Sequence, residues 1–436
     1  MARHTSLSGF PEWLPSKQLV EDQVLDHLRR SFEIHGFSPV VTRAVEPVEQ
    51  LLSKGETSKE IYLLSRLQAE ENEDAQLGLH FDHTVPLARY VVENAGHLTF
   101  PFKRYAIGRV WRGERPQEGR FREFIQADVD VVGDGQLALH HDLELPLVMA
   151  DALGSLPLPK LTIHTSNRKI AQGFYEAIGI ADIAETLRIV DKLDKIGPKA
   201  VAEQLVQSGT TEEQANQALA LAEISGGVEV ADRVLALGAR SELLDEGLDE
   251  LVYVLEGGQE MSPGSIVADL KIARGLDYYT GTVYESLLEG HEDLGAICSG
   301  GRYDSLASSG KKTYPGVGLS IGVSRILSRM ISSEALTVTR QSPTTVLVAV
   351  LNEDQRRESE LIARALRARG IATDVSPGSQ KLGKQIRYAD RRTIPYVWFP
   401  DSGEVKDIRS GEQIPADPET WVPAREDMRP ILMGEQ

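Results

Sequence analysis

The sequence predicts an α+β protein built from an antiparallel sheet flanked by helices, a helical insertion and a smaller α/β domain. Residues 103–111 and 121–132 alternate between polar and apolar around a polar loop, which is typical of a long β-hairpin. Residues 167–260 are rich in Ala, Leu and Glu and favour helices, whereas strand and helix patterns alternate after residue 344. At 436 residues the chain exceeds what one hydrophobic core supports, so two or three domains are expected.

The segment before the hairpin is predicted to hold one long helix and several shorter elements. The helix covers residues 16–35, because Ser16 is a good N-cap, an apolar stripe follows it, and Gly36 ends the pattern. The shorter elements are strands at 37–42, 61–66 and 77–82 and helices at 48–53 and 84–93.

The segment after the hairpin defines the domain boundaries. We expect insertion helices at 199–207, 211–222 and 227–237, strands at 265–271 and 282–288, and a helix at 320–333. The last domain alternates strands at 345–350, 371–375 and 395–399 with helices at 354–369 and 380–391. The predicted parts are the sheet domain in two pieces, 1–166 and 261–333, the insertion 167–260, a linker 334–343 ending at Pro343, and the α/β domain 344–436.

Composition excludes several classes of protein. The formal net charge of −18 argues against a surface coated for nucleic-acid binding, although it allows a local basic patch. No apolar run approaches the roughly 20 residues needed to cross a bilayer, and the N-terminus has no apolar signal segment. A single cysteine, Cys298, excludes an internal disulfide framework and a multi-cysteine zinc site. We therefore expect a cytoplasmic protein with no membrane partner and no metal site of its own.

Two short runs of sequence contain several side chains that are suited to ligand binding. The run from Arg274 to Gly281 places a permanently charged guanidinium beside a carboxylate and two phenols, with glycines at its edges. An arginine fork suits phosphate or carboxylate, and tyrosine rings offer flat walls with a polar tip. The run from Ser299 to Asp304 follows, with a double glycine before Arg-Tyr-Asp. By composition alone, each run is also compatible with a turn that packs on a core.

The hairpin is unusually rich in charge. Six arginines alternate with glutamates between residues 104 and 123. One interpretation is a solvated ribbon with cross-strand ion pairs, each worth about 0.2–1 kcal/mol. The other is a rigid phosphate clamp, because arginines fixed on one face of a sheet can hold reacting groups in place. A basic stripe in the last domain, Lys384, Arg387 and Arg391, likewise fits either a solvated helix face or an RNA contact.

Taken together, these runs resemble the histidyl-tRNA synthetases, a family of class II aminoacyl-tRNA synthetases. The runs at 274–281 and 299–304 resemble the histidine-specific segments of that family. Residues 112–124 are similar to motif 2, residues 316–325 to motif 3, residues 79–86 to the amino-acid-binding segment, and residues 380–399 to the anticodon-binding domain. The matches occur in the family's order along nearly the whole chain. The resemblance implies a class II antiparallel sheet with a helical insertion and a C-terminal anticodon-binding α/β domain.

The resemblance also implies a histidine site. Asp82, Thr84 and Gln126 would receive the α-amino group of the substrate. Asp130, with Tyr278 and Tyr279, would bracket the imidazole and satisfy its two nitrogens. Arg274 would bind both the substrate carboxylate and the α-phosphate of ATP, offsetting the repulsion between them. Arg274, Arg112 and Gln126 are therefore the expected catalytic residues.

The implied ATP and tRNA contacts fall on the hairpin, on motif 3 and on the last domain. Arg112 would grip the α-phosphate and Arg325 the γ-phosphate end, while Glu114 would lie on the adenine side. Arg120 completes the expected ATP-binding set, and Mg²⁺ would accompany the nucleotide. The expected tRNA contacts are Arg115 and Gln117 at the acceptor end, with Lys384, Arg387 and Arg391 in the last domain.

The implied function is a histidine–tRNA ligase that activates L-histidine with ATP and transfers it to the 3′-end of its tRNA. A homodimer is the family expectation, although Arg43 stands where motif 1 has a proline. The alternative is a non-catalytic, histidine-sensing regulatory subunit of the same fold. Such relatives typically lack the C-terminal domain and have an eroded arginine run, whereas this chain retains both.

Overall fold

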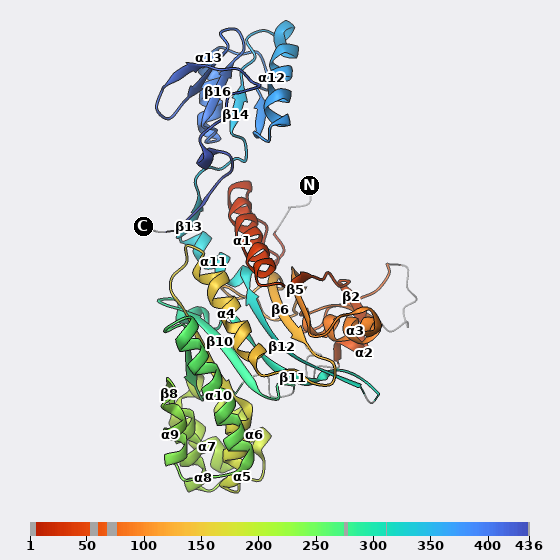
Figure 1. Cartoon of the computed structure of the whole chain (residues 1–436), viewed down its shortest axis with the longest axis vertical. Coiled ribbons are helices and arrows are strands. Elements are labelled where there is room, and N and C mark those ends of the chain that lie inside the picture. Colours follow the sequence, from red (N-terminus) through yellow and green to blue (C-terminus); the bar gives the residue numbers. More distant parts are fainter. Residues whose placement is uncertain (1–5, 53–59, 68–75, 274–277, 311, 435–436) are drawn as a thin grey trace. The chain divides into compact units, whose positions relative to one another are not determined.

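The computed structural model describes residues 6–52, 60–67, 76–273, 278–310 and 312–434. It divides into two compact units. The first comprises the described residues within Met1–Pro11 and His27–Arg329, and the second Glu12–Asp26 and Met330–Gln436. Figure 1 labels the elements of both.

The first unit is built on one large mixed sheet that is mostly antiparallel. Only the β1–β5 and β7–β9 pairs are parallel. In spatial order the strands are β1 (Ser38–Pro39), β5 (Phe102–Trp111), β6 (Glu123–Val132), β12 (Lys312–Gly322), β11 (Cys298–Ser309), β10 (Thr282–Leu288), β7 (Leu161–Asn167), β9 (Ile266–Asp269) and β8 (Ser225–Gly226). This confirms the predicted hairpin and the α+β class.

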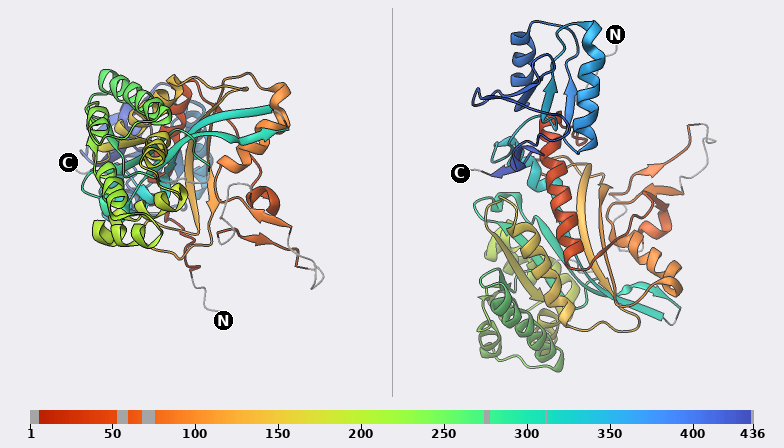
Figure 2. Two further views of the ribbon diagram at one scale, coloured as in Figure 1. Left: turned by 90° about the horizontal axis from the view of Figure 1, so that it is seen from below. Right: turned by 45° about the horizontal axis from the view of Figure 1, so that its top comes forward.

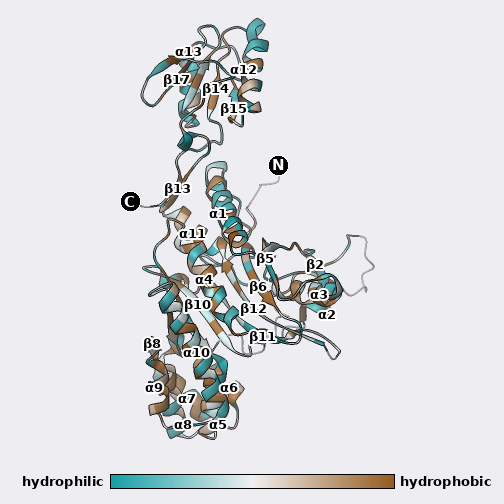
Figure 3. Ribbon diagram, viewed as in Figure 1, coloured by the Kyte–Doolittle hydropathy of each residue, from teal (hydrophilic) through white to brown (hydrophobic). Residues whose placement is uncertain are grey.

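Four residues on neighbouring strands are register partners in one line across the middle of this sheet. Arg104 on β5 pairs with Asp130 on β6, which pairs with Gly318 on β12 and then Gly301 on β11. Along β6 the side chains alternate: Ala127, Val129 and Val131 are fully buried, and the polar residues between them face the opposite side. Figure 3 shows this alternation of hydrophobic and hydrophilic residues along β6.

Helices and a small sheet surround the large sheet. Helix α4 lies across it (Figure 1), and helices α5 to α10 gather at its β8 end, as Figure 2 shows from two further sides. The helices are α1 (Pro15–Ile34), α2 (Val48–Leu51), α3 (Thr84–Asn94), α4 (His140–Gly154), α5 (Arg168–Ala177), α6 (Ile183–Val190), α7 (Leu193–Gln207), α8 (Glu212–Ala222), α9 (Val230–Ala236), α10 (Glu242–Met261) and α11 (Val323–Ser332). The small sheet has the order β2 (Val45–Pro47), β4 (Leu77–Leu79) and β3 (Leu63–Leu64).

The second unit contains a five-stranded sheet with a helix packed on each face. Alternate residues along and just after β14 face opposite sides: Val346 and Val348 pack with α12, whereas Leu347 and Ala349 pack with α13. The strands are, in spatial order, β15 (Thr373–Val375), β14 (Val346–Val348), β16 (Tyr396–Phe399), β17 (Glu404–Asp407) and β18 (Gln413–Pro415), and the helices are α12 (Arg356–Ala368) and α13 (Leu382–Arg391). Its first three strands are parallel, as the alternating pattern predicts.

Several sequence expectations are wrong in detail. The helix expected from residue 320 begins at Val323, because residues 312–322 form β12 and pair with both β6 and β11. The expected linker contains β13 (Leu336–Val338), which pairs with β19 (Leu432–Gly434). Strands expected at 37–42 and 61–66 shrink to two residues each. Helix α4 was not predicted, since Pro146 interrupts its pattern and nearly all its sides are buried.

Candidate active site

Two adjoining pockets open on the polar face of the large sheet. The tyrosine pocket holds about 480 Å³ of space open to solvent and is lined by Asp82, Thr84, Arg112, Gln126, Asp128, Asp130, Tyr278, Tyr279, Ser299, Gly300, Tyr303, Gly318, Leu319 and Ser320. The arginine pocket is lined by Arg112, Glu114, Gly119, Arg120, Phe121, Phe124, Gln126, Ala296, Ile297, Ser299, Ser320, Gly322 and Arg325. Four residues line both pockets and mark where they meet: Arg112, Gln126, Ser299 and Ser320.

Strand β6 supplies the floor of the tyrosine pocket. Because its side chains alternate, Gln126, Asp128 and Asp130 share one face. The Ser320 hydroxyl on β12 donates to Asp128 Oδ1 at 2.5 Å. Gln126 Oε1 is buried and has no hydrogen-bond partner, so it presents an unused acceptor to a ligand. The floor therefore favours a ligand with hydrogen-bond donors.

Asp130 is held from two sides. Its Oδ2 lies 2.8 Å from Arg104 Nη2, and its Oδ1 accepts a hydrogen bond of 2.8 Å from the Tyr303 hydroxyl. Burial, with Asp130 close by, raises the pKa of Tyr303 well above that of a free phenol, so this hydroxyl stays protonated as a donor. Asp130 is 2% exposed and yet lines the pocket, which makes it a fixed acceptor.

Two glycines on β12 make room for these side chains. A Cβ at Gly318 would lie 2.1 Å from Asp130 Oδ1, and a Cβ at Gly316 would lie 2.4 Å from the Tyr303 ring. Real Cβ atoms do not approach other atoms so closely. The Gly-Val-Gly run is therefore part of the pocket itself, because it lets two recognition groups sit directly against the sheet.

Tyr278 and Tyr279 form a wall of the pocket. Their ring centroids are 4.1 Å apart at an interplanar angle of 45°. Burial, reinforced by neighbouring Tyr278, raises the pKa of Tyr279 well above the usual value, so its hydroxyl is neutral and can donate. Together they provide the flat apolar surface and the polar tip that a small planar ring requires.

Asp82 and Thr84 enter the pocket at the start of α3. Asp82 Oδ1 accepts the backbone N–H groups of Thr84 at 3.1 Å and of Val85 at 3.0 Å, which fixes its carboxylate at the helix N-terminus. The next residue, His83, is buried, and that burial lowers its pKa to about 4, aided by Arg104 and His80. A neutral His83 therefore directly follows Asp82, one of three carboxylates that line the pocket.

The arginine pocket has the opposite charge. Arg112 Nε donates to the Phe81 carbonyl at 3.1 Å, and its guanidinium lies 5.2 Å from the Phe124 ring centroid. Arg325 donates to the carbonyl oxygens of Gly119 and Ala296. With Arg120 on the same rim, three cations face a single carboxylate, Glu114. Such a pocket suits an anionic ligand such as a polyphosphate.

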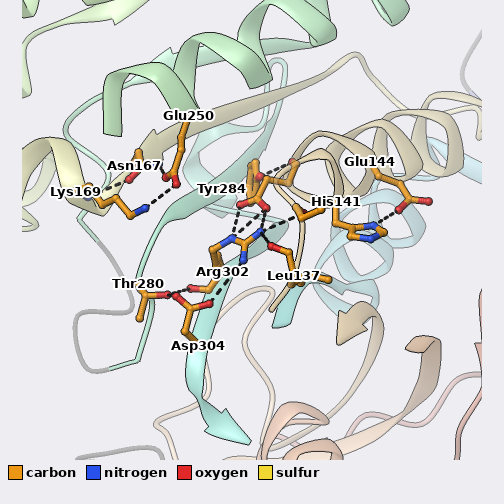
Figure 4. A network of polar contacts seen from close by, with 12 residues as sticks. Leu137, His141, Glu144, Asn167, Lys169, Glu250, Thr280, Tyr284, Arg302 and Asp304 are labelled. Carbon is orange, nitrogen blue, oxygen red and sulfur yellow. Dashed lines mark hydrogen bonds and ion pairs between the residues drawn. The ribbon is translucent and has the colours of Figure 1, made fainter. Parts of the chain in front are cut away.

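A network of polar contacts that includes a buried ion pair extends from Arg302 to Thr280, next to the tyrosine wall in sequence (Figure 4). Arg302 Nε lies 3.2 and 3.1 Å from the two carboxylate oxygens of Asp142 on α4. The backbone N–H of Thr280 donates to the Arg302 carbonyl at 2.9 Å, and its hydroxyl donates to Asp304. Thr280 directly follows Tyr279, so this network anchors the end of the tyrosine run to the scaffold.

The structure gathers the predicted ligand-binding residues in these two pockets. All described members of the expected histidine set line the tyrosine pocket, and the whole expected ATP set lines the arginine pocket. Arg274 lies outside the described residues. Arg115 and Gln117 are exposed on the hairpin loop and line neither pocket, while Lys384, Arg387 and Arg391 are exposed on α13 of the second unit.

Sequence reasoning missed part of the site. Asp128 could have been found from the period of two that links Gln126 and Asp130. Tyr303 was singled out only as a member of the histidine-specific run 299–304, and its contact with Asp130 spans 173 positions of sequence. The role of Arg104 could not be recognised from the sequence, because it is one of several arginines in the hairpin. Burial raises the pKa of the Cys298 thiol to about 12, so this buried side chain is a protonated, weakly polar group and not a nucleophile.

Comparison with known proteins assigns both units. Residues 9–326 match the family model described as histidyl-tRNA synthetase, and residues 345–412 match an anticodon binding domain. The histidine–tRNA ligase of Micrococcus luteus is 55% identical over the full length of both chains. That of Bifidobacterium animalis is also 55% identical, over 97% of each chain.

Solved structures of other proteins match the fold of this chain. The crystal structure of histidyl-tRNA synthetase from Nostoc sp. PCC 7120 matches with a TM-score of 0.85 at 35% identity, covering 95% of this chain and 97% of that one. A Bacillus halodurans protein, described as an ATP phosphoribosyltransferase regulatory subunit/histidyl-tRNA synthetase, matches with a TM-score of 0.75 at 18% identity. At that identity the second match supports the fold alone.

Proposed function

The chain belongs to the histidyl-tRNA synthetase family and is a histidine–tRNA ligase, and we propose how its two pockets perform that reaction. The tyrosine pocket binds L-histidine and the arginine pocket binds ATP. The observation that supports this assignment is the junction of the pockets, where Arg112, Gln126, Ser299 and Ser320 line both. In this proposal the two substrates that must react lie end to end across the junction.

The proposed histidine pose follows the charges. The α-ammonium group faces Asp82, Thr84 and the unpartnered oxygen of Gln126. The imidazole lies against Tyr278 and Tyr279, where Asp130 accepts a ring N–H and a neutral tyrosine hydroxyl reaches the other nitrogen. This pose directs the carboxylate toward the junction. A non-histidine side chain would leave buried polar groups unpaired, so selectivity requires no editing site.

Activation joins the two pockets. A histidine carboxylate oxygen attacks the α-phosphorus of ATP, a P–O bond forms, and pyrophosphate leaves with the electron pair of the broken bond. Arg112 at the junction offsets the repulsion between the two anions and stabilises charge on the phosphoryl oxygens. Arg325 and Arg120 hold the leaving phosphates, and Glu114 lies on the adenine side. Arg274 joins this set in the proposal through the family resemblance.

Transfer follows from the same geometry. The terminal ribose 3′-hydroxyl of the tRNA attacks the carbonyl carbon of histidyl-adenylate, and AMP leaves. We assign the exposed hairpin residues Arg115 and Gln117 to the acceptor end of the tRNA. We assign Lys384, Arg387 and Arg391, exposed on α13 of the anticodon binding domain, to a tRNA contact in that domain.

Mg²⁺ belongs to the proposal as the ion that enters with ATP. Among the described residues, no group of three or more His, Cys, Asp or Glu is placed to hold a metal ion. The ion would therefore be coordinated largely by phosphate oxygens and water, as Mg²⁺ prefers.

A homodimer and a cytoplasmic location complete the proposal. Large apolar side chains are exposed on and near the small sheet β2–β4–β3: Val41, Leu63, Leu67 and Leu77. A second copy that covers this surface would remove it from water. Sedimentation equilibrium tests the dimer directly, and a purely monomeric protein at micromolar concentration would contradict it. Among the described helices, none is long and apolar enough to cross a membrane.

The decisive experiment is ATP–pyrophosphate exchange with each amino acid in turn. We expect exchange with histidine and background rates with the other amino acids. A histidine-sensing regulatory subunit would bind histidine without consuming ATP, and the arginine pocket argues against that alternative. No histidine-dependent exchange by the full chain would overturn the proposed function.

A further inference from the structure

The carboxylate of Asp130 is paired with a buried cation that does not itself line the pocket. Arg104 Nη2 lies 2.8 Å from Asp130 Oδ2, and the two side chains are 2% and 3% exposed. Arg104 Nη2 also donates to the His83 carbonyl at 3.2 Å. Its Nε is buried without a hydrogen-bond partner. A buried guanidinium with an unsatisfied N–H is costly, so its pairing with Asp130 calls for an explanation.

The charge of this pair decides which form of a ring the pocket prefers. An uncompensated carboxylate would attract a protonated imidazolium. A carboxylate already neutralised by a guanidinium has lone pairs left and acts as a hydrogen-bond acceptor without excess charge. Neutral imidazole has one N–H donor and one acceptor nitrogen, which match Asp130 and a neutral tyrosine hydroxyl.

Arg104 forms an ion pair with Asp130, whereas Arg112 lines the same pocket at its junction with the arginine pocket. Burial lowers the pKa of His83 to about 4, so this side chain is neutral near pH 7. Other titratable groups around the pair or its partners include His80 and Asp82 before α3, Tyr278 and Tyr279 in the loop, and Tyr303 on β11, and the same pocket is lined by Asp128 and Arg112.

We propose that Arg104 is a positioning residue that fixes and neutralises Asp130, so that the pocket binds histidine with a neutral imidazole ring. The proposal rests on the proposed function, because it concerns the side chain of that substrate. Arg104 acts through Asp130 and makes no contact with the ring.

The test is histidine binding to the full chain by calorimetry, without ATP, between about pH 5.5 and pH 8.5. The wild type should lose affinity about tenfold per pH unit below the ring pKa of about 6.5, because the ring must release its proton. A triazole analogue of histidine, whose ring stays neutral, should show no such loss. An equal loss for the analogue would place the titration in the protein and overturn the proposal.

The Arg104→Met variant should reverse the sign of this dependence. Without the guanidinium, the complex keeps one more proton, on the ring or on Asp130, so affinity rises as pH falls from about 8 to 6.5. Calorimetry in buffers of different ionisation enthalpy should then report uptake approaching one proton near neutral pH, against nearly none for the wild type. A folded variant with the wild-type profile and no proton uptake would show that Arg104 does not set the ring's charge.

Arg109→Met is the matched control, because Arg109 lies on the same strand but is exposed and pairs with Glu123. It should keep the wild-type profile. If Arg104→Met does not fold, the double variant Arg104→Met/Asp130→Asn replaces the ion pair with neutral groups. It should bind histidine more weakly than the wild type without proton uptake, and wild-type affinity at every pH would overturn the proposal.

The wild type separates this inference from the proposed function. If the wild type neither binds histidine nor supports histidine-dependent exchange, the proposed function fails and the inference with it. If the wild type exchanges normally while Arg104→Met keeps its pH profile, only the role of Arg104 fails.

Discussion

Asp130 on β6 and Gly318 on β12 are register partners across the sheet, and a Cβ at position 318 would lie 2.1 Å from Asp130 Oδ1. The position of the Asp130 carboxylate thus depends on the absence of a Cβ atom at Gly318. We expect Gly318→Ala to displace Asp130 and to raise KM for histidine by about 10²-fold in the exchange assay, since a misplacement near 1 Å has that effect. Gly96→Ala, where no atom lies within 4 Å of the added Cβ, is the control. An unchanged KM in a folded Gly318→Ala protein would contradict the assignment of Asp130.

Arg112 lines both pockets, so its removal should affect chemistry more than binding of either substrate. A lysine there keeps the charge but loses the planar fork. We expect Arg112→Lys to lower kcat for pyrophosphate exchange by about 10²–10³-fold, as for other donors that stabilise developing charge. Arg115→Ala, exposed and outside both pockets, should exchange at the wild-type rate. Equal kcat values for Arg112→Lys and the wild type would remove Arg112 from the reaction.

The pair Arg302–Asp142 should contribute to both stability and histidine binding. Removing one partner leaves a buried charge uncompensated, so Arg302→Met should lower the free energy of unfolding by about 3–5 kcal/mol. It should also raise KM for histidine, because the Arg302 side chain pairs with Asp304, which accepts the hydroxyl of Thr280 beside Tyr279. Chemical denaturation and the exchange assay measure these effects. Arg329→Ala breaks exposed ion pairs with Glu118 and Asp293 and should change stability little. Similar losses in the free energy of unfolding for Arg302→Met and Arg329→Ala would refute the distinction between the buried and the exposed ion pairs.

His83 predicts an acid-sensitive fold. Its pKa is about 4 in the folded protein and about 6.5 when unfolded, so the unfolded state binds more protons between these values. The contribution of neutral His83 to the free energy of unfolding is fully present above about pH 6.5. It is lost as the pH falls toward 4, and the loss is on the order of 3 kcal/mol. His83→Gln should remove this part of the pH dependence when the free energy of unfolding is measured by denaturation. A variant with the wild-type slope would assign the titration elsewhere.

The face of α13 should matter only when tRNA is present. The triple variant Lys384→Ala, Arg387→Ala and Arg391→Ala removes three exposed charges. Exchange without tRNA should be unchanged, whereas KM for tRNA in aminoacylation should rise and its salt dependence should weaken, by up to about 0.7 in log–log slope per lost contact. A surface triple substitution on α12, Arg357→Ala, Arg364→Ala and Glu360→Ala, serves as control. An unaltered KM for tRNA would instead support the interpretation of this stripe as a solvated helix face that does not contact tRNA.

Much of the fold could be predicted from local patterns. The hairpin over 103–132, the helices of the insertion and the alternating C-terminal unit follow from periods of two and of about 3.6 residues. The predictions that were wrong involve long-range pairing. Residues 320–322 read as helix because the sequence does not reveal that β12 continues between β6 and β11. Helix α4 was missed because a buried helix has no polar stripe to give it a period.

The sequence by itself determined the residue types of the site and their order, and through the family resemblance it indicated histidine, ATP and tRNA as substrates. Only the tertiary structure decided how these residues combine. Asp130 meets Tyr303 across 173 positions of sequence, and the two pockets share Arg112 and Gln126 because β6 pairs with both β5 and β12. In the sequence Arg104 is one of six arginines in the charged hairpin, and strand register places it, buried, against Asp130. Charge compensation depends on distance in space, and sheet register, which the sequence does not display, sets that distance.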